Sequence, residues 1–393
     1  MRGVPTSLDV QSTAGALSVL VPSSRDALRA TGASIEVEGS SLAGLVEPRA
    51  PLNCGNSGTT MRLLAGVLAS RPFEAVLEGD ASLTARPMER IATPLREMGA
   101  SVETSDGHSP VTIRGGPLHG IRWRVDPPSA QVKGALLLAG LQADGMTTVE
   151  EAMVTRDHTE RALEALGGPI ERGERMVSLG RFQHSGFEGD VPGDVSSAAF
   201  LIGAAALTGS DIEVEGVGLN PSRLAFVTVL RRMGVDVTLT PERTEMGEPV
   251  GGLITRPTTL RGTTVSSMEL PLVIDEVPVL SMVAACAEGE SRFEGAGELR
   301  VKETDRLDGV VQGIHALGGD AAIEADALVV GGGGLRGGRV DSGGDHRLAM
   351  AFAVAALAAG AESVVEGMGS AAVSFPGFIT TLGKLGARIE VER

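Results

Sequence analysis

The sequence predicts an α/β protein with two domains, assembled from six copies of one small unit. Two patterns support this fold class. The end of an amphipathic helix, a glycine and a short strand recur six times along the chain. Polar turns followed by helices rich in alanine and leucine alternate with these segments. A chain of 393 residues is also longer than one hydrophobic core ordinarily supports, which favours two domains.

A glycine marks the recurring helix end. The six copies are LRATGASIEVE at Gly32, LREMGASVETS at Gly99, LEALGGPIERG at Gly167, LRRMGVDVTLT at Gly234, IHALGGDAAIE at Gly318 and LGKLGARIEVE at Gly386. Successive glycines are 67 or 68 residues apart, with one interval of 84. Because glycine readily adopts the left-handed conformation in which helices end, each copy is expected to close a helix and begin a strand.

Five of the six units also show a polar helix start. These starts are NCGNSGTTMRLLAGVLA from Asn53, PSAQVKGALLLAGL from Pro128, VPGDVSSAAFLIGAAAL from Val191, IDEVPVLSMVAACA from Ile274 and GGDHRLAMAFAVAALAA from Gly343. Asn, Ser, Asp and Gly are the residues that cap helix N-termini. Helix starts present free N–H groups, so several of them facing one cleft would bind anions.

The first unit lacks such a start. In the other five units the start precedes the glycine by 38 to 43 residues, and residues 1–27 contain no convincing substitute. We therefore expect a truncated first unit. The predicted domains are residues 1–188, with three units of which the first is incomplete, and residues 189–393, with three units and a hinge near residue 189.

Composition excludes several classes of function. The formal net charge of −16 argues against nucleic acid as a partner. No apolar run is long enough to span a bilayer, and the N-terminus does not resemble a signal peptide, so we expect a cytoplasmic protein that does not bind membranes. Neither the two cysteines, Cys54 and Cys286, nor the six histidines have a metal-ligand spacing. In so acidic a chain, short motifs rich in Arg and Lys indicate binding of a small anion.

Nine motifs, in this order, resemble the 5-enolpyruvylshikimate-3-phosphate synthase family. They are NCGNSGTTMRLL, RPMERIATPLREMGA, SAQVKGALLLAGL, TRDHTERAL, VPGDVSSAAF, IDEVPVL, LRVKETDRL, GDHRLAMAF and SFPGF. The resemblance runs from about residue 28 to the C-terminus, and the SAQ and TRDHTE motifs are similar to the second major sequence class. It implies the enolpyruvyl transferase fold, an inverted α/β barrel in which each domain holds three βαβαββ units.

The resemblance also implies the reaction. Members of the family transfer the enolpyruvyl group of phosphoenolpyruvate to the 5-hydroxyl of shikimate 3-phosphate and release phosphate, in the shikimate pathway to chorismate and aromatic amino acids. They are the target of glyphosate, and they need no metal or organic cofactor. We expect the same two small-molecule substrates here, and a monomer.

Carried over by motif, the resemblance assigns site residues. Phosphoenolpyruvate would be bound by Asn56, Ser57, Gly58, Arg86, Gln131, Arg306 and Arg347. Shikimate 3-phosphate would be bound by Ser129, Ala130, Gln131, Arg156, Asp275 and Lys302. The catalytic residues would be Asp275 as base or orienter of the reacting hydroxyl, Glu303 as acid toward the methylene carbon, and Lys302 near that hydroxyl. The arginine fork matches carboxylate and phosphate, and addition followed by elimination needs one proton acceptor and one donor. Closure on shikimate 3-phosphate is expected to bring Arg306, Arg347 and Glu303 onto Asp275, Arg86 and Gln131.

Each motif also has a structural interpretation. LRVKETDRL could be a solvated helix start, and VPGDVSSAAF a helix cap at a crossover between domains. Arg86 could simply precede a helix with Pro87 in its first turn. Arg156 could be a surface residue, and His346 could lie beside the site without a role.

The chain departs from the family at its N-terminus, where members carry a P-G-D-K-S-x-S-H-R motif whose Lys, Ser and Arg contact the substrates. A misplaced start codon or truncated gene would explain this, as would a paralogue that binds shikimate-pathway metabolites with little catalysis. A UDP-N-acetylglucosamine enolpyruvyl transferase would need a catalytic Cys that is missing between Cys54 and Cys286. An RNA 3′-terminal phosphate cyclase would need a catalytic His and a less acidic surface. We expect weak or no turnover from residues 1–393.

Overall fold

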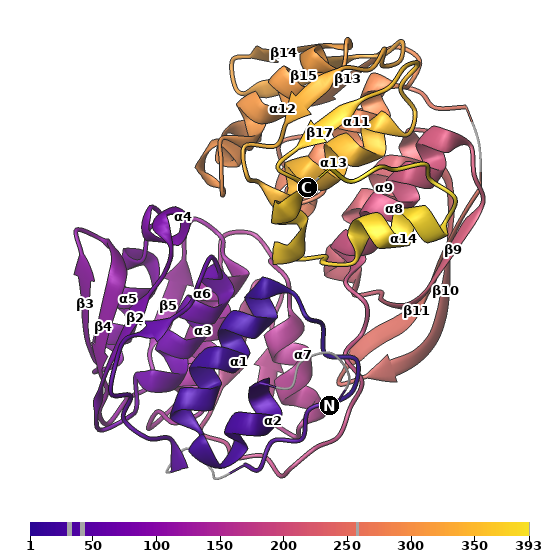
Figure 1. Cartoon of the computed structure of the whole chain (residues 1–393). Coiled ribbons are helices and arrows are strands. Elements are labelled where there is room, and N and C mark those ends of the chain that lie inside the picture. The colour runs from indigo at the N-terminus through magenta and orange to yellow at the C-terminus, as the bar shows by residue number, and fades with distance from the viewer. Residues whose placement is uncertain (30–33, 40–43, 257–258, 393) are drawn as a thin grey trace. The chain divides into compact units, whose positions relative to one another are not determined.

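The computed structural model describes residues 1–29, 34–39, 44–256 and 259–392 (Figure 1). The chain forms two compact bodies. The N-terminal body comprises Met1–Val191 with Thr244–Glu248, and the C-terminal body comprises Pro192–Arg243 with Pro249–Arg393. The boundary expected from the sequence, after residue 188, lies three residues before this division and stays a prediction.

The N-terminal body contains two βαβαββ units of identical topology. The elements of one are β1 (Leu52–Asn53), α3 (Gly58–Leu68), β2 (Glu74–Glu78), the short α4 (Ala81–Thr84), α5 (Glu89–Glu97), β3 (Ser101–Ser105) and β4 (His108–Arg114). Those of the other are β5 (Arg122–Val125), α6 (Ala130–Gly140), β6 (Thr147–Glu151), α7 (His158–Ala165), β7 (Ile170–Arg172) and β8 (Met176–Leu179). Their strand orders, β1-β2-β4-β3 and β5-β6-β8-β7, correspond strand for strand. In each sheet the first two strands are parallel and the remaining pairs antiparallel.

The C-terminal body continues the series with three more units. The first has α8 (Val195–Thr208), β9 (Ile212–Gly218), η3 (Pro221–Arg223), α9 (Ala225–Arg232), β10 (Asp236–Glu245) and β11 (Glu248–Arg256). The second has β12 (Thr264–Val265), α10 (Leu270–Val273), α11 (Val277–Ala285), β13 (Glu290–Phe293), η4 (Ala296–Val301), α12 (Arg306–Ala316), β14 (Asp320–Glu324) and β15 (Ala327–Gly331). The third has β16 (Arg339–Asp341), α13 (His346–Ala356), β17 (Val364–Glu366), η5 (Met368–Val373) and α14 (Phe378–Lys384). The order β12-β13-β15-β14 repeats the pattern of the N-terminal body.

Five of the six expected glycine stops lie in the described chain. Gly99, Gly167, Gly234, Gly318 and Gly386 all have positive φ, between 78° and 111°, and each follows the end of a helix. These five predictions are confirmed, while Gly32 lies outside the described residues. The prediction of a strand after Gly386 is wrong, because residues 387–392 have no regular structure. Among the described residues β16 and β17 pair only with each other, so no antiparallel hairpin completes this last sheet.

The polar helix starts behave as expected at four of the five helices. Ser57, Ser129, Asp194 and Asp345 each accept a hydrogen bond from a backbone N–H in the first turn of the following helix. The exception is α11, whose N-cap residue is Glu276 and whose cap makes no side-chain hydrogen bond. Asp275 is therefore not the N-cap residue of α11.

The N-terminal segment differs from the expectation that residues 1–27 contain no helix start. Residues Leu8–Leu20 form α1, followed by η1 (Pro22–Ser24) and α2 (Arg25–Arg29). Ala16 and Leu20 of α1 are buried in the core of the N-terminal body. The N-cap residue Ser7 makes no side-chain cap bond, and the α1 segment LDVQSTAGALSVL contains neither Arg nor Lys. A helix thus forms here, but it brings no cation.

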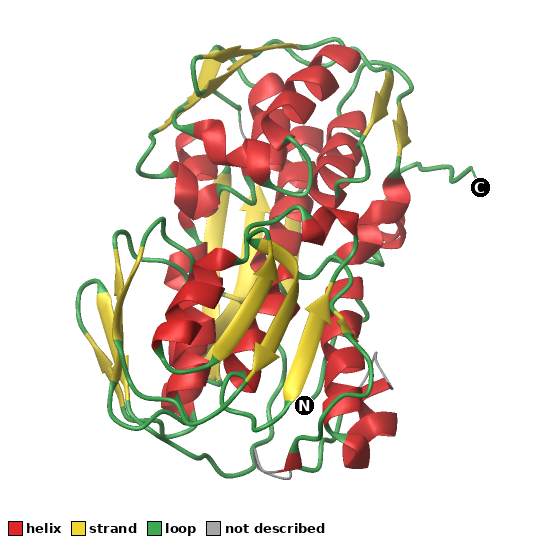
Figure 2. Cartoon of the chain, turned by 90° about the vertical axis from the view of Figure 1, so that its left-hand side faces the viewer, coloured by secondary structure: helices red, strands yellow, loops and turns green. Residues whose placement is uncertain are grey.

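The central helices explain why their sequences lack a polar face. All nine residues of α11 are buried, as are most residues of α8 and α13. A helix that is apolar all round must be enclosed on every side. Figure 1 shows α8, α11 and α13 within the C-terminal body, and in Figure 2 strands lie toward the outside of the helices of that body. In the N-terminal body α3 and α6 approach so closely that a Cβ on Gly66 would lie 2.1 Å from the carbonyl oxygen of Ala135.

No helix among the described residues is long and apolar enough to cross a membrane.

Candidate active site

The loop before α3 places Asn56 between an acid and an arginine. The Asn56 amide nitrogen donates to Asp80 Oδ2 over 2.9 Å, and its oxygen accepts from Arg86 Nη2 over 2.9 Å. Asp80 also caps α4 through the Leu83 N–H at 2.8 Å. The loop, the start of α4 and Arg86 are therefore held to one another. Arg86 lies in the turn between α4 and α5, not in a helix.

Two further arginines that the sequence analysis did not select lie near Arg86. Arg62 Nη1 donates to Gln131 Oε1 over 2.5 Å, and Gln131 Nε2 donates to Thr59 Oγ1 over 2.7 Å. Burial lowers the pKa of Arg62 to about 10, and repulsion from Arg86 and Arg90 adds to this effect. An anion bound here would relieve that repulsion, so this corner of the N-terminal body is suited to a phosphate or carboxylate.

Spacing could have identified Arg62, which follows Gly58 by four residues on α3. It does not identify Arg90, because Arg86, four residues before it, lies outside the helix. Residues four apart lie on the same face of a helix, so Arg62 points to the same side as the loop that begins α3.

Three of the residues expected to bind shikimate 3-phosphate lie at the start of α6. Ser129 is the N-cap, Ala130 is the first helical residue, and Gln131 reaches Arg62 and Thr59 as described. Arg156 lies in the loop between β6 and α7 and is half-buried. The structure thus brings Gln131 together with the arginine corner, while Arg156 comes from a separate loop of the same body.

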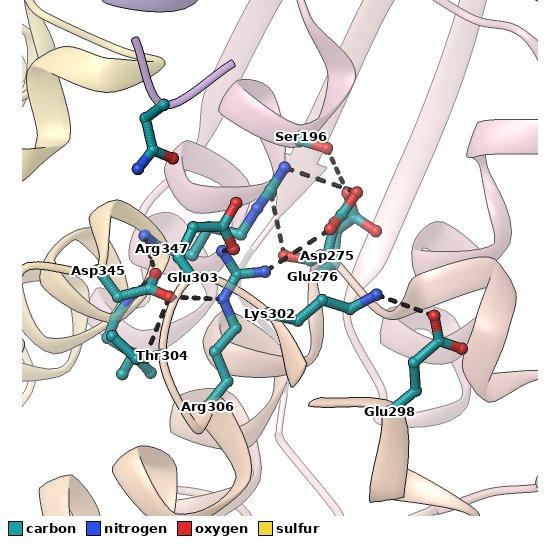
Figure 3. A network of polar contacts seen from close by, with 12 residues as sticks. Ser196, Asp275, Glu276, Glu298, Lys302, Glu303, Thr304, Arg306, Asp345 and Arg347 are labelled. Atoms are coloured by element: carbon teal, nitrogen blue, oxygen red, sulfur yellow. Dashed lines mark hydrogen bonds and ion pairs between the residues drawn. The ribbon is translucent and has the colours of Figure 1, made fainter. Parts of the chain in front are cut away.

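In the C-terminal body, two arginines meet Asp275 (Figure 3). Arg306 Nη1 lies 3.8 Å from Asp275 Oδ1, and Arg347 Nη2 lies 3.6 Å from Asp275 Oδ2. Arg347 Nη1 also donates to the Asp275 carbonyl oxygen over 3.0 Å. The expectation that domain closure is needed to bring these arginines onto Asp275 is therefore wrong, because all three residues belong to one body and already face one another.

Arg306 is the centre of this group. Its side chain is only 1% exposed, and Nε donates to the fully buried Asp345 over 2.8 Å. Its Nη2 pairs with Glu303. Asp345 in turn accepts from the backbone N–H groups of Arg347 and Leu348 at the start of α13. We call Asp275, Glu303, Arg306, Asp345 and Arg347 the arginine–acid cluster.

Two members of the cluster, Arg347 and Asp345, have pKa values that favour their charged forms. Burial opposes the charged form of Arg347, but Asp275, and then Glu276, raise its pKa above the ordinary value. Burial likewise opposes ionisation of Asp345, yet Arg306, through its charge and its hydrogen bond, leaves the pKa of Asp345 below the ordinary value. Fixed guanidinium groups beside carboxylates are suited to binding an anion and to moving a proton.

The amine of Lys302 pairs with Glu298 of η4. This amine lies 3.2 Å from Glu298 Oε1, and in Figure 3 the side chain extends toward Glu298. The position of Lys302 next to Glu303 in the sequence does not make the two side chains share partners. Its expected place near the reacting hydroxyl stays a prediction.

Of the two acids in the motif IDEVPVL, Glu276 is buried and Asp275 is partly exposed. The Glu276 side chain is 2% exposed, against 16% for Asp275. Ser196 donates its hydroxyl hydrogen to Glu276, and Arg223 Nη2 donates to Ser196 Oγ over 2.5 Å. Sequence reasoning missed Glu276 and Arg223 because their link to Ser196 spans distant segments. Through this chain of contacts, the turn that carries Asp275 is fixed to the start of α8.

His346, beside Arg347, should make stability depend on pH. Burial, followed by Arg347 and Arg306, lowers its pKa to about 4. The unfolded chain, with an ordinary histidine pKa near 6.5, therefore binds more protons between these values. The free energy of unfolding should fall as the pH drops from 6.5 to 4, by up to about 3 kcal/mol from this residue.

The measurement is urea unfolding of the wild type and of His346→Gln at pH 7 and pH 4.5. The variant should lose less stability over this range than the wild type. His184→Gln, which changes an exposed histidine, is the control and should follow the wild type. Equal pH dependence of all three proteins would contradict the prediction.

Comparison with known proteins places this geometry in context. The sequence model of one family, described as EPSP synthase (3-phosphoshikimate 1-carboxyvinyltransferase), matches residues 1–382. A 3-phosphoshikimate 1-carboxyvinyltransferase of Acidithiobacillus ferrooxidans is 49% identical over 359 residues, covering 91% of this chain and 83% of the relative. One of Halorhodospira halophila is 48% identical over 380 residues, covering 93% and 86%.

Solved structures agree. An EPSP synthase from Acinetobacter baumannii matches with a TM-score of 0.84 and 38% identity, covering 99% of this chain and 96% of that one. The enolpyruvyl transferase NikO from Streptomyces tendae matches with a TM-score of 0.71 at 20% identity, covering 99% and 94%, which is evidence for the fold alone.

Proposed function

The chain belongs to the EPSP synthase (3-phosphoshikimate 1-carboxyvinyltransferase) family, and from this premise we propose which of its residues carry the reaction. The predicted family resemblance and the α/β enolpyruvyl transferase fold are confirmed. The chain is a transferase of the shikimate pathway that moves the enolpyruvyl group of phosphoenolpyruvate to the 5-hydroxyl of shikimate 3-phosphate.

For the N-terminal body, we propose two tasks. Arg86 and the backbone of Asn56, Ser57 and Gly58 bind phosphoenolpyruvate, supported by the repulsion among Arg62, Arg86 and Arg90 that a bound anion would relieve. Ser129, Ala130, Gln131 and Arg156 bind shikimate 3-phosphate. The first set is held by the Asn56–Asp80 and Asn56–Arg86 hydrogen bonds, and Gln131 is oriented by Arg62 and Thr59.

For the C-terminal body, we propose that the arginine–acid cluster performs the proton transfers. Asp275 accepts the proton of the 5-hydroxyl, and Glu303 donates a proton to the methylene carbon of phosphoenolpyruvate. Arg306 and Arg347 bind the phosphoenolpyruvate anion and hold the departing phosphate, while Lys302 acts beside the reacting hydroxyl. The observation that carries this proposal is the carboxylate of Asp275 lying within 4 Å of the buried guanidinium group of Arg306 and of the half-buried one of Arg347.

The proposed function is tested with an isotope-labelled substrate. The protein is incubated with carbon-13-labelled phosphoenolpyruvate and shikimate 3-phosphate, and the 5-enolpyruvyl ether is detected by NMR together with phosphate release. UDP-N-acetylglucosamine replaces shikimate 3-phosphate as the control acceptor. Product with shikimate 3-phosphate alone supports the proposal, whereas product with UDP-N-acetylglucosamine alone, or no binding of shikimate 3-phosphate by calorimetry, refutes it.

We also infer that the protein works as a monomer in the cytoplasm, where phosphorylated biosynthetic intermediates are made and consumed. Both proposed half-sites are built from one chain, so neither requires a second copy. A mass near 40.3 kDa by light scattering is the expected result, and a stable dimer would contradict it.

Gly58 should be essential for tight phosphoenolpyruvate binding. A Cβ at this position would lie 2.6 Å from Arg62 Nη1 and 3.2 Å from Arg86 Nη1, so Gly58→Ala must displace at least one guanidinium group. Because small misplacements of binding groups are costly, we expect KM for phosphoenolpyruvate to rise about tenfold, with a smaller effect on shikimate 3-phosphate. Gly15→Ala, where a Cβ would meet nothing within 4 Å, is the matched control. An unchanged KM in Gly58→Ala would contradict the prediction.

A further inference from the structure

A buried lysine in the N-terminal body has no role in the site described so far. Lys133, in the second turn of α6, is 1% exposed. Its amine lies 2.9 Å from Glu151 Oε2 and 2.7 Å from Glu160 Oε1. Glu151 ends β6 and Glu160 belongs to the first turn of α7, and both are buried. One ammonium group therefore joins three elements of the unit.

Glu151 carries this connection onward to a loop. While Oε2 contacts Lys133, Oε1 accepts hydrogen bonds from the Thr155 backbone N–H, over 3.2 Å, and from the Thr155 hydroxyl. Thr155 directly precedes Arg156. The loop between β6 and α7 is thus anchored, at the residue next to Arg156, to the side chain of Lys133.

Lys133 lies on the same part of α6 as residues proposed to bind shikimate 3-phosphate. Lys133 lies two residues after Gln131 and four after Ser129, so it shares a helix turn with the groups proposed to bind shikimate 3-phosphate. Gly134 brings α6 and α7 together closely, since a Cβ there would lie 3.0 Å from Thr159 Oγ1. Two short contacts, from Lys133 to Glu151 and from Glu151 to Thr155, therefore connect the start of α6 to the residue next to Arg156.

Packing alone does not account for three buried charges. Apolar side chains of similar volume are often as stabilising as a buried ion pair, because desolvation offsets the attraction. Here two carboxylates face one ammonium, and Glu160 Oε2 is buried with no hydrogen-bond partner among the described residues. Such an arrangement favours one geometry over alternatives rather than adding stability.

We propose that Lys133 is a positioning residue for substrate binding. Through Glu151 and Thr155 it holds the Arg156 loop at a fixed distance from Ser129 and Gln131, so that shikimate 3-phosphate meets a preformed set of donors. This inference rests on the proposed function, because Arg156 matters only if it binds that substrate. Lys133 itself does not touch the substrate.

Thr155→Val tests the anchor with little change in volume. It removes the hydroxyl that donates to Glu151 and leaves Lys133 and both carboxylates in place. A hydrogen bond to a charged group is lost, so we expect shikimate 3-phosphate to bind about tenfold more weakly by calorimetry. The KM for phosphoenolpyruvate at saturating shikimate 3-phosphate should stay within about twofold. Amide hydrogen exchange of residues 152–157 should become faster.

Thr147→Val is the matched control. Thr147 lies on β6 with Glu151, is fully buried, and its hydroxyl has no hydrogen-bond partner among the described residues. The same chemical change there should alter neither shikimate 3-phosphate affinity nor exchange of the loop. Equal effects of the two substitutions would overturn the proposal, because they would show a general response to loss of a threonine hydroxyl.

Lys133 itself is tested in the double variant Lys133→Met/Glu160→Gln. Removing one positive and one negative charge keeps the net charge of the buried group unchanged, which favours folding. We expect weaker shikimate 3-phosphate binding, by tenfold or more, and faster exchange of residues 152–157. A folded double variant with wild-type affinity and wild-type exchange would overturn the proposal.

The two hypotheses fail in different ways. If the wild-type protein does not bind shikimate 3-phosphate, the proposed function fails. Amide exchange is measured without substrate, so it still decides the anchor: Thr155→Val against Thr147→Val tests the contact with Glu151, and the double variant tests Lys133.

Discussion

Asp275→Asn is expected to reduce kcat by about 10²- to 10⁴-fold, the usual contribution of a positioned general base. The amide keeps the shape of the side chain but cannot accept the proton of the 5-hydroxyl. Arg306 and Arg347 would then lose a negative neighbour and present more positive charge to an incoming anion. We therefore expect the KM for phosphoenolpyruvate to stay the same or to fall. A large loss in kcat without a rise in KM would distinguish catalysis from binding.

Steady-state kinetics at high enzyme concentration, as the weak turnover expected of residues 1–393 requires, and thermal unfolding check this result. Glu324→Gln, which neutralises an acid in the exposed ion pair with Arg292, is the control and should leave both kinetic constants unchanged. If Asp275→Asn kept kcat within about threefold of the wild type, Asp275 would not be the base. An equal rise in KM for both substrates would instead indicate an orienting role.

Much of the fold could be predicted because its signals are local. A glycine with positive φ ends a helix through the conformation of a single residue, so Gly99 and Gly234 could be identified without knowing their surroundings. Capping by Ser57 or Asp345 likewise depends on a few adjacent residues. The predictions of the fold failed where the structure of a segment depends on residues distant in the sequence. Helix α1 forms although Ser and Thr interrupt its apolar residues, because Ala16 and Leu20 are buried against the rest of the body.

In the site, too, local signals could be predicted and contacts between distant residues could not. Motif resemblance selected Arg86, Arg306 and Arg347, but the sequence did not show which residues they contact. Arg306 contacts Asp345, which lies 39 residues further along the chain, and Gln131 meets Arg62, which lies 69 residues before it. Such pairs arise from packing of separate units, so spacing within one motif does not reveal them. Lys302 shows the converse, because adjacency to Glu303 in sequence does not give it the same partners.

Arg306→Met is expected to destabilise the protein by about 3–5 kcal/mol, the cost of leaving a buried charge without its partner. Asp345 is fully buried, and its carboxylate is stabilised by Arg306 through charge and a 2.8 Å hydrogen bond. Methionine replaces the volume of the arginine stem but not its charge. Asp345 also caps α13, so its rearrangement would loosen the start of that helix. Urea unfolding at pH 7 measures the difference.

The pH dependence shows whether Asp345 is the cause. Its pKa is lower in the folded protein than the ordinary value near 4, so the stabilisation by Arg306 is present above that value and is lost as the pH falls through the folded pKa. The gap in stability between wild type and Arg306→Met should therefore narrow below pH 4. Arg306→Met/Asp345→Asn should recover part of the loss at pH 7, because no charge is then left buried opposite the methionine. If Arg306→Met lost the same free energy of unfolding at pH 7 and below pH 4, and Asp345→Asn recovered none of it, the cause would be a packing defect. The arginine–acid cluster would then be held together by shape, and not by the opposed charges on which the proposed proton transfers depend.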